Sequence, residues 1–254
     1  MTLYENERED FVNDDLTLIQ KTDGLVFGTD ALLLAGYVKG RYSHAAELGG
    51  GSGIISMLLI TRKKCDSCDV YEIQPEYAEL IERNAERNSL SGLRSIRADI
   101  REIPGEKRES CDIVLTNPPY MKADGGERCT LDAKNIARHE VFGTIDDFCR
   151  AAKRLLKYGG TFAAVYRPDR LIDLIAAMRA HGLEPKRMTF VHADERSRSS
   201  MVLVEAKRGG KGGLFLTKPL LLYKDSSHKE FSEEMKYIDE NGCFPPDFIS
   251  QGGA

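Results

Sequence analysis

Short runs of apolar, β-favouring residues alternate along the chain with longer segments in which apolar residues recur at helical spacing. This alternation is typical of an α/β fold with a mostly parallel sheet. The predicted strands of the parallel part span residues 45–48, 69–73, 93–98, 111–115 and 161–166. The predicted helices span residues 54–60, 146–158 and 169–181, and a further helix begins at Pro75.

The pattern changes after the last of these helices. Residues 187–193 and 200–206 are two β-rich runs joined by a polar turn, which predicts an antiparallel hairpin at one edge of the sheet. Gly159 and Gly160 follow the helix predicted at 146–158, and we expect them to end it. The chain therefore predicts a doubly wound, mostly parallel seven-stranded sheet that ends in a C-terminal antiparallel hairpin.

Chain length favours a single domain over residues 1–254. Within it we expect an N-terminal cap at 1–43, a core at 44–206 and a C-terminal extension at 207–254. The extension is too short to be an independent domain.

Apolar run lengths and the N-terminal sequence indicate where in the cell the protein works. The longest apolar runs fall far short of the ~20 residues that a membrane span needs, and the charged N-terminus has no apolar signal segment. We therefore expect a cytoplasmic protein with no membrane partner.

Six cysteines in 254 residues are not a disulfide framework. Cys65 and Cys68 lack the further ligands of a zinc site, so no metal is predicted.

Net charge limits how the protein can bind nucleic acid. The formal charge of −4 argues against avid, non-specific nucleic-acid binding. Clusters of lysine and arginine along the chain still allow one local basic face, although any single cluster is also typical of a solvated surface.

A glycine-rich loop, Glu-Leu-Gly-Gly-Gly-Ser-Gly at 47–53, lies between the first core strand and its helix. Glycines let the backbone turn sharply and approach a ligand, and ligands bind at the carboxyl ends of such strands. Glu47 precedes Gly49, Gly51 and Gly53, and this order suits a ligand with a cationic amino-acid end. A single glycine loop is also compatible with a plain turn.

Two further acids follow the next two strands. Glu72 closes the second strand, where a carboxylate can accept both hydroxyls of a ribose. Asp99 closes the third strand, within reach of an adenine amino group, and Ile73 and Ile100 follow the two acids at the same predicted site. The ordered set resembles class I S-adenosylmethionine-dependent methyltransferases, roughly over residues 45–206. The resemblance implies S-adenosyl-L-methionine as the cofactor.

The fourth strand ends in Asn-Pro-Pro-Tyr. This sequence resembles the [D/N]-P-P-[Y/F] motif of amino-methyltransferases, whose targets are planar nitrogens of adenine, cytosine or a glutamine amide. The resemblance places Asn117, Pro118, Pro119 and Tyr120 at the reacting amine, with Asn117 also beside the cofactor.

The side-chain carbonyl of Asn117 and the backbone carbonyl of Pro118 can accept both amine hydrogens, and the prolines fix their geometry. Tyr120 can stack on a planar base. The alternative is a proline-terminated strand with an incidental tyrosine.

Further segments resemble one family, the bacterial tRNA(Val) adenine-N6 methyltransferases. They are residues 23–35, 117–120, 137–140, 155–160 and 165–168. By this resemblance the first segment is a permuted cofactor motif within the N-terminal cap, in which Phe27, Thr29 and Asp30 would wall the methionine end of the cofactor. The alternative is an ordinary helix capped by Thr29 or Asp30.

The same resemblance implies a tRNA substrate. Arg138 and His139 would bind the target nucleotide or organise the segment before them, although they are equally typical of a solvated helix start. Arg196 and Arg198, in the predicted hairpin turn, are candidates for contacts with RNA phosphates.

The predicted function is transfer of a methyl group from S-adenosyl-L-methionine to the N6 amine of an adenine in RNA, which in the resembled family is adenine 37 of tRNA(Val). Methylation of a release-factor glutamine uses the same motif chemistry and is the first alternative. A non-catalytic module that binds the cofactor or RNA is the second.

Overall fold

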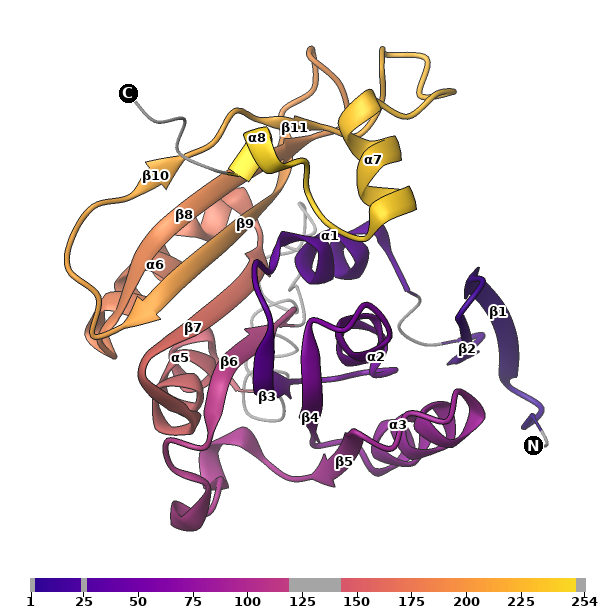
Figure 1. Ribbon diagram of the computed structural model, residues 1–254, viewed down its shortest axis with the longest axis vertical. Coiled ribbons are helices and arrows are strands. Elements are labelled where there is room, and N and C mark those ends of the chain that lie inside the picture. The colour runs from indigo at the N-terminus through magenta and orange to yellow at the C-terminus, as the bar shows by residue number, and fades with distance from the viewer. Residues whose placement is uncertain (1–2, 24–26, 119–142, 250–254) are drawn as a thin grey trace, which may run out of the picture.

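The computed structural model describes residues 3–23, 27–118 and 143–249. Its centre is one large sheet with helices packed on both faces (Figure 1). Four of the residues singled out above lie outside the described residues: Pro119, Tyr120, Arg138 and His139.

Five neighbouring strands run parallel in the order β5-β4-β3-β6-β7. Their bounds are β3 Tyr42–Leu48, β4 Cys65–Glu72, β5 Leu93–Arg97, β6 Cys111–Thr116 and β7 Leu156–Tyr166. The antiparallel hairpin follows, with β9 (Ser199–Arg208) inserted between β7 and β8 (Leu183–His192). The predicted mostly parallel sheet and its C-terminal hairpin are therefore confirmed.

Two very short strands extend the sheet beyond the seven that the sequence predicts. β10 (Phe215–Leu216) and β11 (Leu220–Leu221) both pair in parallel with β8, which gives a nine-stranded sheet. Both lie within residues 214–223, which the sequence pattern indicates as one further strand-like run, but the structure forms two short strands there in place of one.

The helices divide between the two faces of the sheet. Helices and 3₁₀ turns of the core are α1 Thr29–Tyr37, α2 Ile54–Thr61, α3 Pro75–Arg87, η1 Ile100–Glu102, η2 Gly105–Lys107, α5 Ile145–Leu155, η3 Pro168–Arg170 and α6 Leu171–Ala180. α2 and α3 bury Leu58 and Ile81 in one apolar cluster. α5 and α6 bury Phe148 and Leu174 in a second cluster, which lies against other strand residues. Helices on both faces make the sheet doubly wound, as predicted.

The helix predicted at 146–158 is shorter than expected. α5 ends at Leu155 and β7 begins at the next residue, so Gly159 and Gly160 lie inside a strand and do not end a helix. Gly159 has φ +78°, and a Cβ at Gly160 would lie 2.8 Å from the carbonyl oxygen of Lys157. The pair permits an irregular start of β7, because only glycine tolerates both conditions.

A hairpin at the N-terminus stands apart from the main sheet, and the sequence pattern did not predict it. β1 (Glu7–Asn13) pairs antiparallel with β2 (Leu16–Lys21). The fully buried Asn84 of α3 fixes its position. The Asn84 side chain accepts from the Ile19 N–H at 2.8 Å and donates to the carbonyl oxygens of Ile19 at 2.9 Å and Ser52 at 3.0 Å. The hairpin is thereby attached to the glycine-rich loop.

The C-terminal extension packs over α1 through aromatic rings. It forms α7 (Glu233–Asn241) and α8 (Pro246–Ile249). The Tyr37 ring lies edge-on to Phe244 with centroids 5.3 Å apart, and the Arg187 guanidinium lies 4.1 Å from the centre of the same tyrosine ring. Burial raises the pKa of Tyr37 to about 12. The extension is therefore part of the packed structure around α1.

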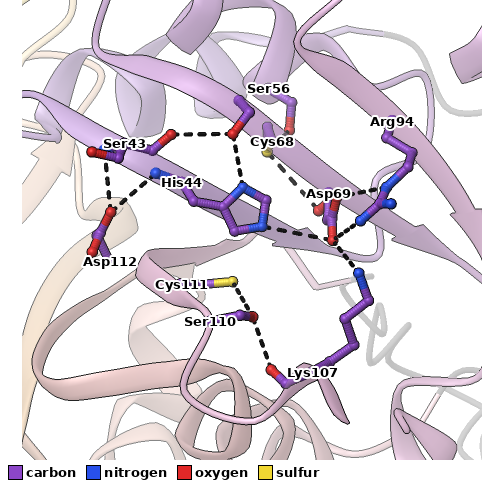
Figure 2. Close-up of polar contacts among 11 residues, drawn as sticks. Ser43, His44, Ser56, Cys68, Asp69, Arg94, Lys107, Ser110, Cys111 and Asp112 are labelled. Atoms are coloured by element: carbon purple, nitrogen blue, oxygen red, sulfur yellow. Dashed lines mark hydrogen bonds and ion pairs between the residues drawn. The ribbon is translucent and has the colours of Figure 1, made fainter.

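A partly buried ionic cluster joins β3, β4 and the start of β5 (Figure 2). Asp69 of β4 accepts two hydrogen bonds from Arg94, at 2.9 and 2.7 Å, and lies 3.3 Å from Lys107 Nζ. His44 Nε2 of β3 lies 3.7 Å from the same carboxylate. Burial opposes the charge of Asp69, but His44 and Arg94 outweigh it and lower the pKa of this carboxyl. The Asp69 carboxylate in turn raises the pKa of His44 to about 9.

We expect the His44 charge to stabilise the fold only below alkaline pH. The histidine pKa is about 6.5 in an unfolded chain and about 9 in the fold, so its contribution is complete below about pH 6.5 and lost as the pH rises through about 9. His44 is partly exposed, so solvent screening reduces this contribution. His44→Gln should lower the free energy of unfolding at about pH 6 by about 1–2 kcal/mol and have little effect at about pH 10. Urea denaturation of both proteins at the two pH values measures this, and a difference independent of pH would contradict it.

Candidate functional site

The carboxyl ends of four parallel strands meet at one edge of the sheet. In the observed register Leu48 of β3 pairs with both Tyr71 of β4 and Thr116 of β6. The Thr116 hydroxyl donates to the Leu48 carbonyl oxygen at 2.9 Å and ties the two strand ends together. Glu72 pairs with Arg97 at the end of β5. The loops that follow these strands are therefore neighbours, as the position of ligand sites in α/β sheets requires.

Three glycines of the loop have positive φ angles. Gly49, Gly51 and Gly53 have φ of +72°, +55° and +81°, a region that side chains rarely enter. A Cβ at Gly50 would lie 2.1 Å from a methyl group of Val70, so this position requires glycine as well. The loop therefore lies directly on β4, and at its four glycines no side chain stands between the backbone and a ligand.

The loop and Glu72 hold each other. The Gly51 N–H donates to Glu72 Oε2 at 3.0 Å, and the Gln74 N–H donates to Glu72 Oε1 at 2.9 Å. Each carboxylate oxygen retains a second lone pair that can accept a hydroxyl. A buried, oriented pair of acceptors at this position fits the two hydroxyls of a ribose.

Glu47 is buried beneath the loop. Its Oε2 accepts from the N–H of Ser56 at 3.0 Å and also from the Ser56 hydroxyl. Burial raises the pKa of Glu47 to about 7, which the hydrogen bonds from Ser56 partly oppose. The side chain anchors the first turn of α2 to the end of β3, so it supports the loop from within the protein.

Asp99 and its neighbours lie at the end of β5. The Asp99 side chain caps η1 by accepting from the Arg101 N–H at 2.9 Å, and its Oδ2 pairs with Arg101 Nη2 at 2.5 Å. These contacts with Arg101 lower the pKa of Asp99. Ile100 is buried in the apolar cluster on the α5 face, and Ile73 is half-buried. The carboxylate already has a partner, so an adenine amino group there would share it with Arg101.

Asn117 and Asp30 form the contact that defines the centre of the site. Asn117 Nδ2 donates to Asp30 Oδ2 at 2.9 Å. A carboxylate only accepts hydrogen bonds, so this contact fixes which end of the amide faces Asp30. Asn117 Oδ1 is then buried without a hydrogen-bond partner among the described residues. Buried carbonyl groups are normally paired, so this oxygen is an acceptor that a ligand N–H can satisfy.

The segment before α1 is arranged differently from the capped helix considered above. The N-cap of α1 is Gly28, and no side chain caps it. Thr29 is exposed, and Asp30 Oδ1 accepts from the Ala31 N–H at 2.9 Å while its other oxygen binds Asn117. The Phe27 N–H donates to Gln20 Oε1 at 2.8 Å. Asp30 is thus turned toward the end of β6, and neither Thr29 nor Asp30 is the N-cap residue of α1.

Asp30 also lines a cavity of about 370 Å³. This volume lies within the ~300–1,000 Å³ range typical of small-molecule sites. It is lined by Thr29, Asp30, Tyr166, Arg167, Ser200, Met201 and Leu222. Sequence reasoning missed the last five of these residues as site residues. The signal for Tyr166 was its place at the end of β7, next to β6. Met201 lies in β9 and Leu222 directly follows β11, and the sequence does not reveal the order of these strands in the sheet.

The remaining predicted site residues lie at the same end of the sheet. Arg196 and Arg198 are exposed in the turn between β8 and β9. Over the part of the chain that the structure describes, no group of three or more His, Cys, Asp or Glu side chains is placed to hold a metal ion. Within that same part, no helix has the length and apolar character needed to cross a membrane.

Comparison with known proteins identifies the family. The methyltransferase small domain family matches residues 22–175, which is more than half of the chain and includes the glycine loop and Asn117. The chain belongs to this family. This methyltransferase uses S-adenosyl-L-methionine as its cofactor, as the loop and acids predicted.

Curated relatives support the resemblance stated above. The chain is 27% identical to the tRNA1(Val) (adenine(37)-N6)-methyltransferase of Phocaeicola vulgatus over 71% of this chain and 76% of the relative. It is 23% identical to the protein of the same name from Aliivibrio salmonicida, over 72% and 77% of the two chains.

Solved structures share the fold of this methyltransferase. A predicted O-methyltransferase from Agrobacterium tumefaciens superposes with a TM-score of 0.69 at 23% identity, covering 85% of this chain and 98% of that one. TYW2 from M. jannaschii, in complex with AdoMet, gives a TM-score of 0.55 at 15% identity over 82% and 88% of the two chains.

Removing the Glu72 carboxylate should weaken cofactor binding. Glu72→Ala deletes two charge-assisted acceptors and loosens the loop at Gly51, so we expect the Kd for S-adenosyl-L-methionine to rise by about ten- to a hundredfold. Isothermal titration calorimetry measures it. Glu76→Ala is the matched control, since it removes an exposed carboxylate four residues away. Equal Kd values for the two variants would place the ribose elsewhere.

Proposed function

We propose that this methyltransferase transfers a methyl group to the N6 amine of an adenine in RNA, and that its target is adenine 37 of tRNA(Val). The observation that carries the proposal is the buried carbonyl oxygen of Asn117 at the end of β6, which has no hydrogen-bond partner within the described part of the chain. Such an acceptor suits an N–H of a planar amine. The names of the relatives from Phocaeicola vulgatus and Aliivibrio salmonicida support adenine in tRNA as the bearer of that amine.

The target amine needs activation, because its lone pair is delocalised into the ring. Asn117 Oδ1 accepts one amine hydrogen, and the backbone carbonyl of Pro118 accepts the other. Both acceptors act on a fixed backbone, because proline restricts its own φ and the conformation of the preceding residue. The two hydrogen bonds turn the lone pair out of the ring plane, toward the side where the glycine loop lies.

S-adenosyl-L-methionine, when bound, supplies the electrophilic methyl group. The chain holds it through the backbone of Gly49, Gly51 and Gly53 and through the carboxylate of Glu72, with Glu47 supporting the loop. Asp99, Ile73 and Ile100 flank the adenine end, and Phe27 and Thr29 the methionine end.

The protein needs no strong general base, because the nitrogen becomes acidic once methylated and loses its proton to water. A neutral amide at Asn117 therefore suffices. In-line positioning of the two reactants supplies most of the rate, a contribution that can reach about 7–11 kcal/mol.

From the order of the strands, we assign the cofactor and the target adenine to opposite sides of β6. The glycine loop and Glu72 follow β3 and β4 on one side of β6, whereas the cavity beside Asp30 is lined from β7 and β9 on the other side. Asn117 lies between them. The target adenine, extruded from its RNA loop as such chemistry requires, enters this cavity, with Tyr120 stacked on it. Arg138, His139, Arg196 and Arg198 then serve the surrounding nucleotide and phosphates.

Exchanging the groups at positions 30 and 117 tests how the amide is oriented. Asn117→Asp alone places two carboxylates about 3 Å apart, so we expect kcat to fall by about two orders of magnitude. Asp30→Asn combined with Asn117→Asp restores an amide donor facing a carboxylate, with the polarity reversed, and should recover most of that loss. Initial rates at saturating cofactor and RNA measure both, and Asn117→Ala, with unchanged cofactor Kd, is the inactive reference. If the kcat of the double variant is no higher than that of Asn117→Asp, Asp30 does not determine the orientation of the Asn117 amide.

The substrate is tested by incubating the protein with labelled S-adenosyl-L-methionine and, separately, total RNA, purified tRNA or a release factor. We expect label in tRNA, recovered as N6-methyladenosine after nucleoside analysis. Label in the release factor, recovered as methylglutamine, would replace RNA by a protein substrate. Label in neither, with cofactor binding intact, would favour a non-catalytic binding module.

A further inference from the structure

The segment between β11 and α7 forms a closed loop beside the cavity. Leu222 lines the cavity and its N–H donates to the His192 carbonyl oxygen at 2.9 Å. Tyr223, the next residue, forms an antiparallel bridge with Phe231, which closes residues 223–231 into one loop. Figure 1 shows this loop beside the turn between β8 and β9, at the end of the molecule where β11 lies.

Three rings of this loop are stacked. Tyr223 and Phe231 are 5.4 Å apart between centroids with planes inclined by 21°, and Tyr223 and His228 are 4.8 Å apart at 24°. Phe231 nevertheless keeps 41% of its surface exposed. An apolar ring held nearly parallel to a neighbour and open to solvent offers a flat face that a second planar group can cover.

The loop is held firmly to the β8–β9 turn. His228 has φ +54°, a conformation that is uncommon outside glycine. Its Nε2 lies 2.6 Å from Asp194 Oδ2, and the other oxygen of Asp194 accepts from the N–H groups of Arg196 at 2.8 Å and Ser197 at 3.0 Å. The stacked rings and the turn that carries Arg196 and Arg198 are therefore one unit, ordered before any ligand binds.

Charges around the rings are mixed. Exposed arginine and lysine side chains of the turn and loop stand beside exposed acids of the same segments: Arg196, Arg198, Lys224 and Lys229, with Glu195, Asp225 and Glu230. Attraction between net charges is therefore weak over this surface as a whole, although Arg196 and Arg198 can each contact a phosphate. A planar ligand gains from stacking, which is the interaction that RNA-binding surfaces offer to unpaired bases.

We infer that the 223–231 loop is a stacking platform for RNA, on which the exposed ring of Phe231, backed by the Tyr223 ring, receives an unpaired base next to the one that enters the cavity. The inference rests on the proposed function and specifies which part of the chain binds the RNA outside the reacting nucleotide. Extruding the target base unstacks its neighbours, and a rigid aromatic face at the rim of the cavity restacks one of them.

Two substitutions of Phe231 separate stacking from simple apolar contact. Phe231→Leu keeps apolar bulk without a ring, and we expect it to raise the Kd for tRNA by about 5- to 150-fold. Phe231→Tyr keeps the ring and should bind tRNA like the wild type. Phe11→Leu is the matched control, because Phe11 is an exposed aromatic residue of β1, 72% accessible, outside the loop and the cavity. Fluorescence anisotropy with labelled tRNA measures each Kd.

Salt dependence and cofactor binding complete the test. Stacking releases no counterions, so Phe231→Leu should leave the slope of log K against log salt unchanged, and the Kd for S-adenosyl-L-methionine should also stay unchanged. Wild-type affinity for tRNA in Phe231→Leu, or an equal loss in Phe11→Leu, would overturn the inference while the proposed function stands. A changed salt slope would assign the effect to phosphates and overturn it too. If the wild-type protein methylates no RNA, the proposed function itself fails.

Discussion

The parallel register at one edge of the sheet is the constraint on which the site depends. Leu48 pairs with Tyr71 on one side and with Thr116 on the other, and the Thr116 hydroxyl locks the second pair. Because these strands end at the same level, the residues that follow them meet in one space. A one-residue slip of β6 would turn Asn117 to the opposite face of the sheet and away from Asp30.

The contact between Asp30 and Asn117 brings together residues 87 positions apart in the chain. It occupies the donor end of the amide and leaves the acceptor end buried, with no partner among residues 3–23, 27–118 and 143–249. A buried polar group without a partner costs about 1–3 kcal/mol, and a ligand N–H at this oxygen would remove such a cost. Departures of this kind from complete hydrogen bonding are characteristic of functional sites.

Local signals predicted the core elements and much of the candidate site. Glu47, the loop glycines and Glu72 were predicted as site residues because a strand end and a few neighbouring residues are enough to identify each of them. The hairpin of β1 and β2 was missed because β1 is charged and has no apolar alternation. Gly159 and Gly160 were misread because a helix stop and a strand irregularity both favour glycine. The role of Asp30 was not visible, since its partner lies in a distant strand.

The sequence by itself determined the fold class and the cofactor-type glycine loop, because each is encoded by the order and type of adjacent residues. Only the tertiary structure decided that Asp30 orients Asn117, that Tyr166, Met201 and Leu222 enclose a cavity, and that the C-terminal loop lies beside it. The first feature joins the start of α1 to the end of β6. The other two arise where β9 inserts between β7 and β8 and where β11 pairs with β8. Strand order is a property of long-range packing, which no local pattern of residues specifies.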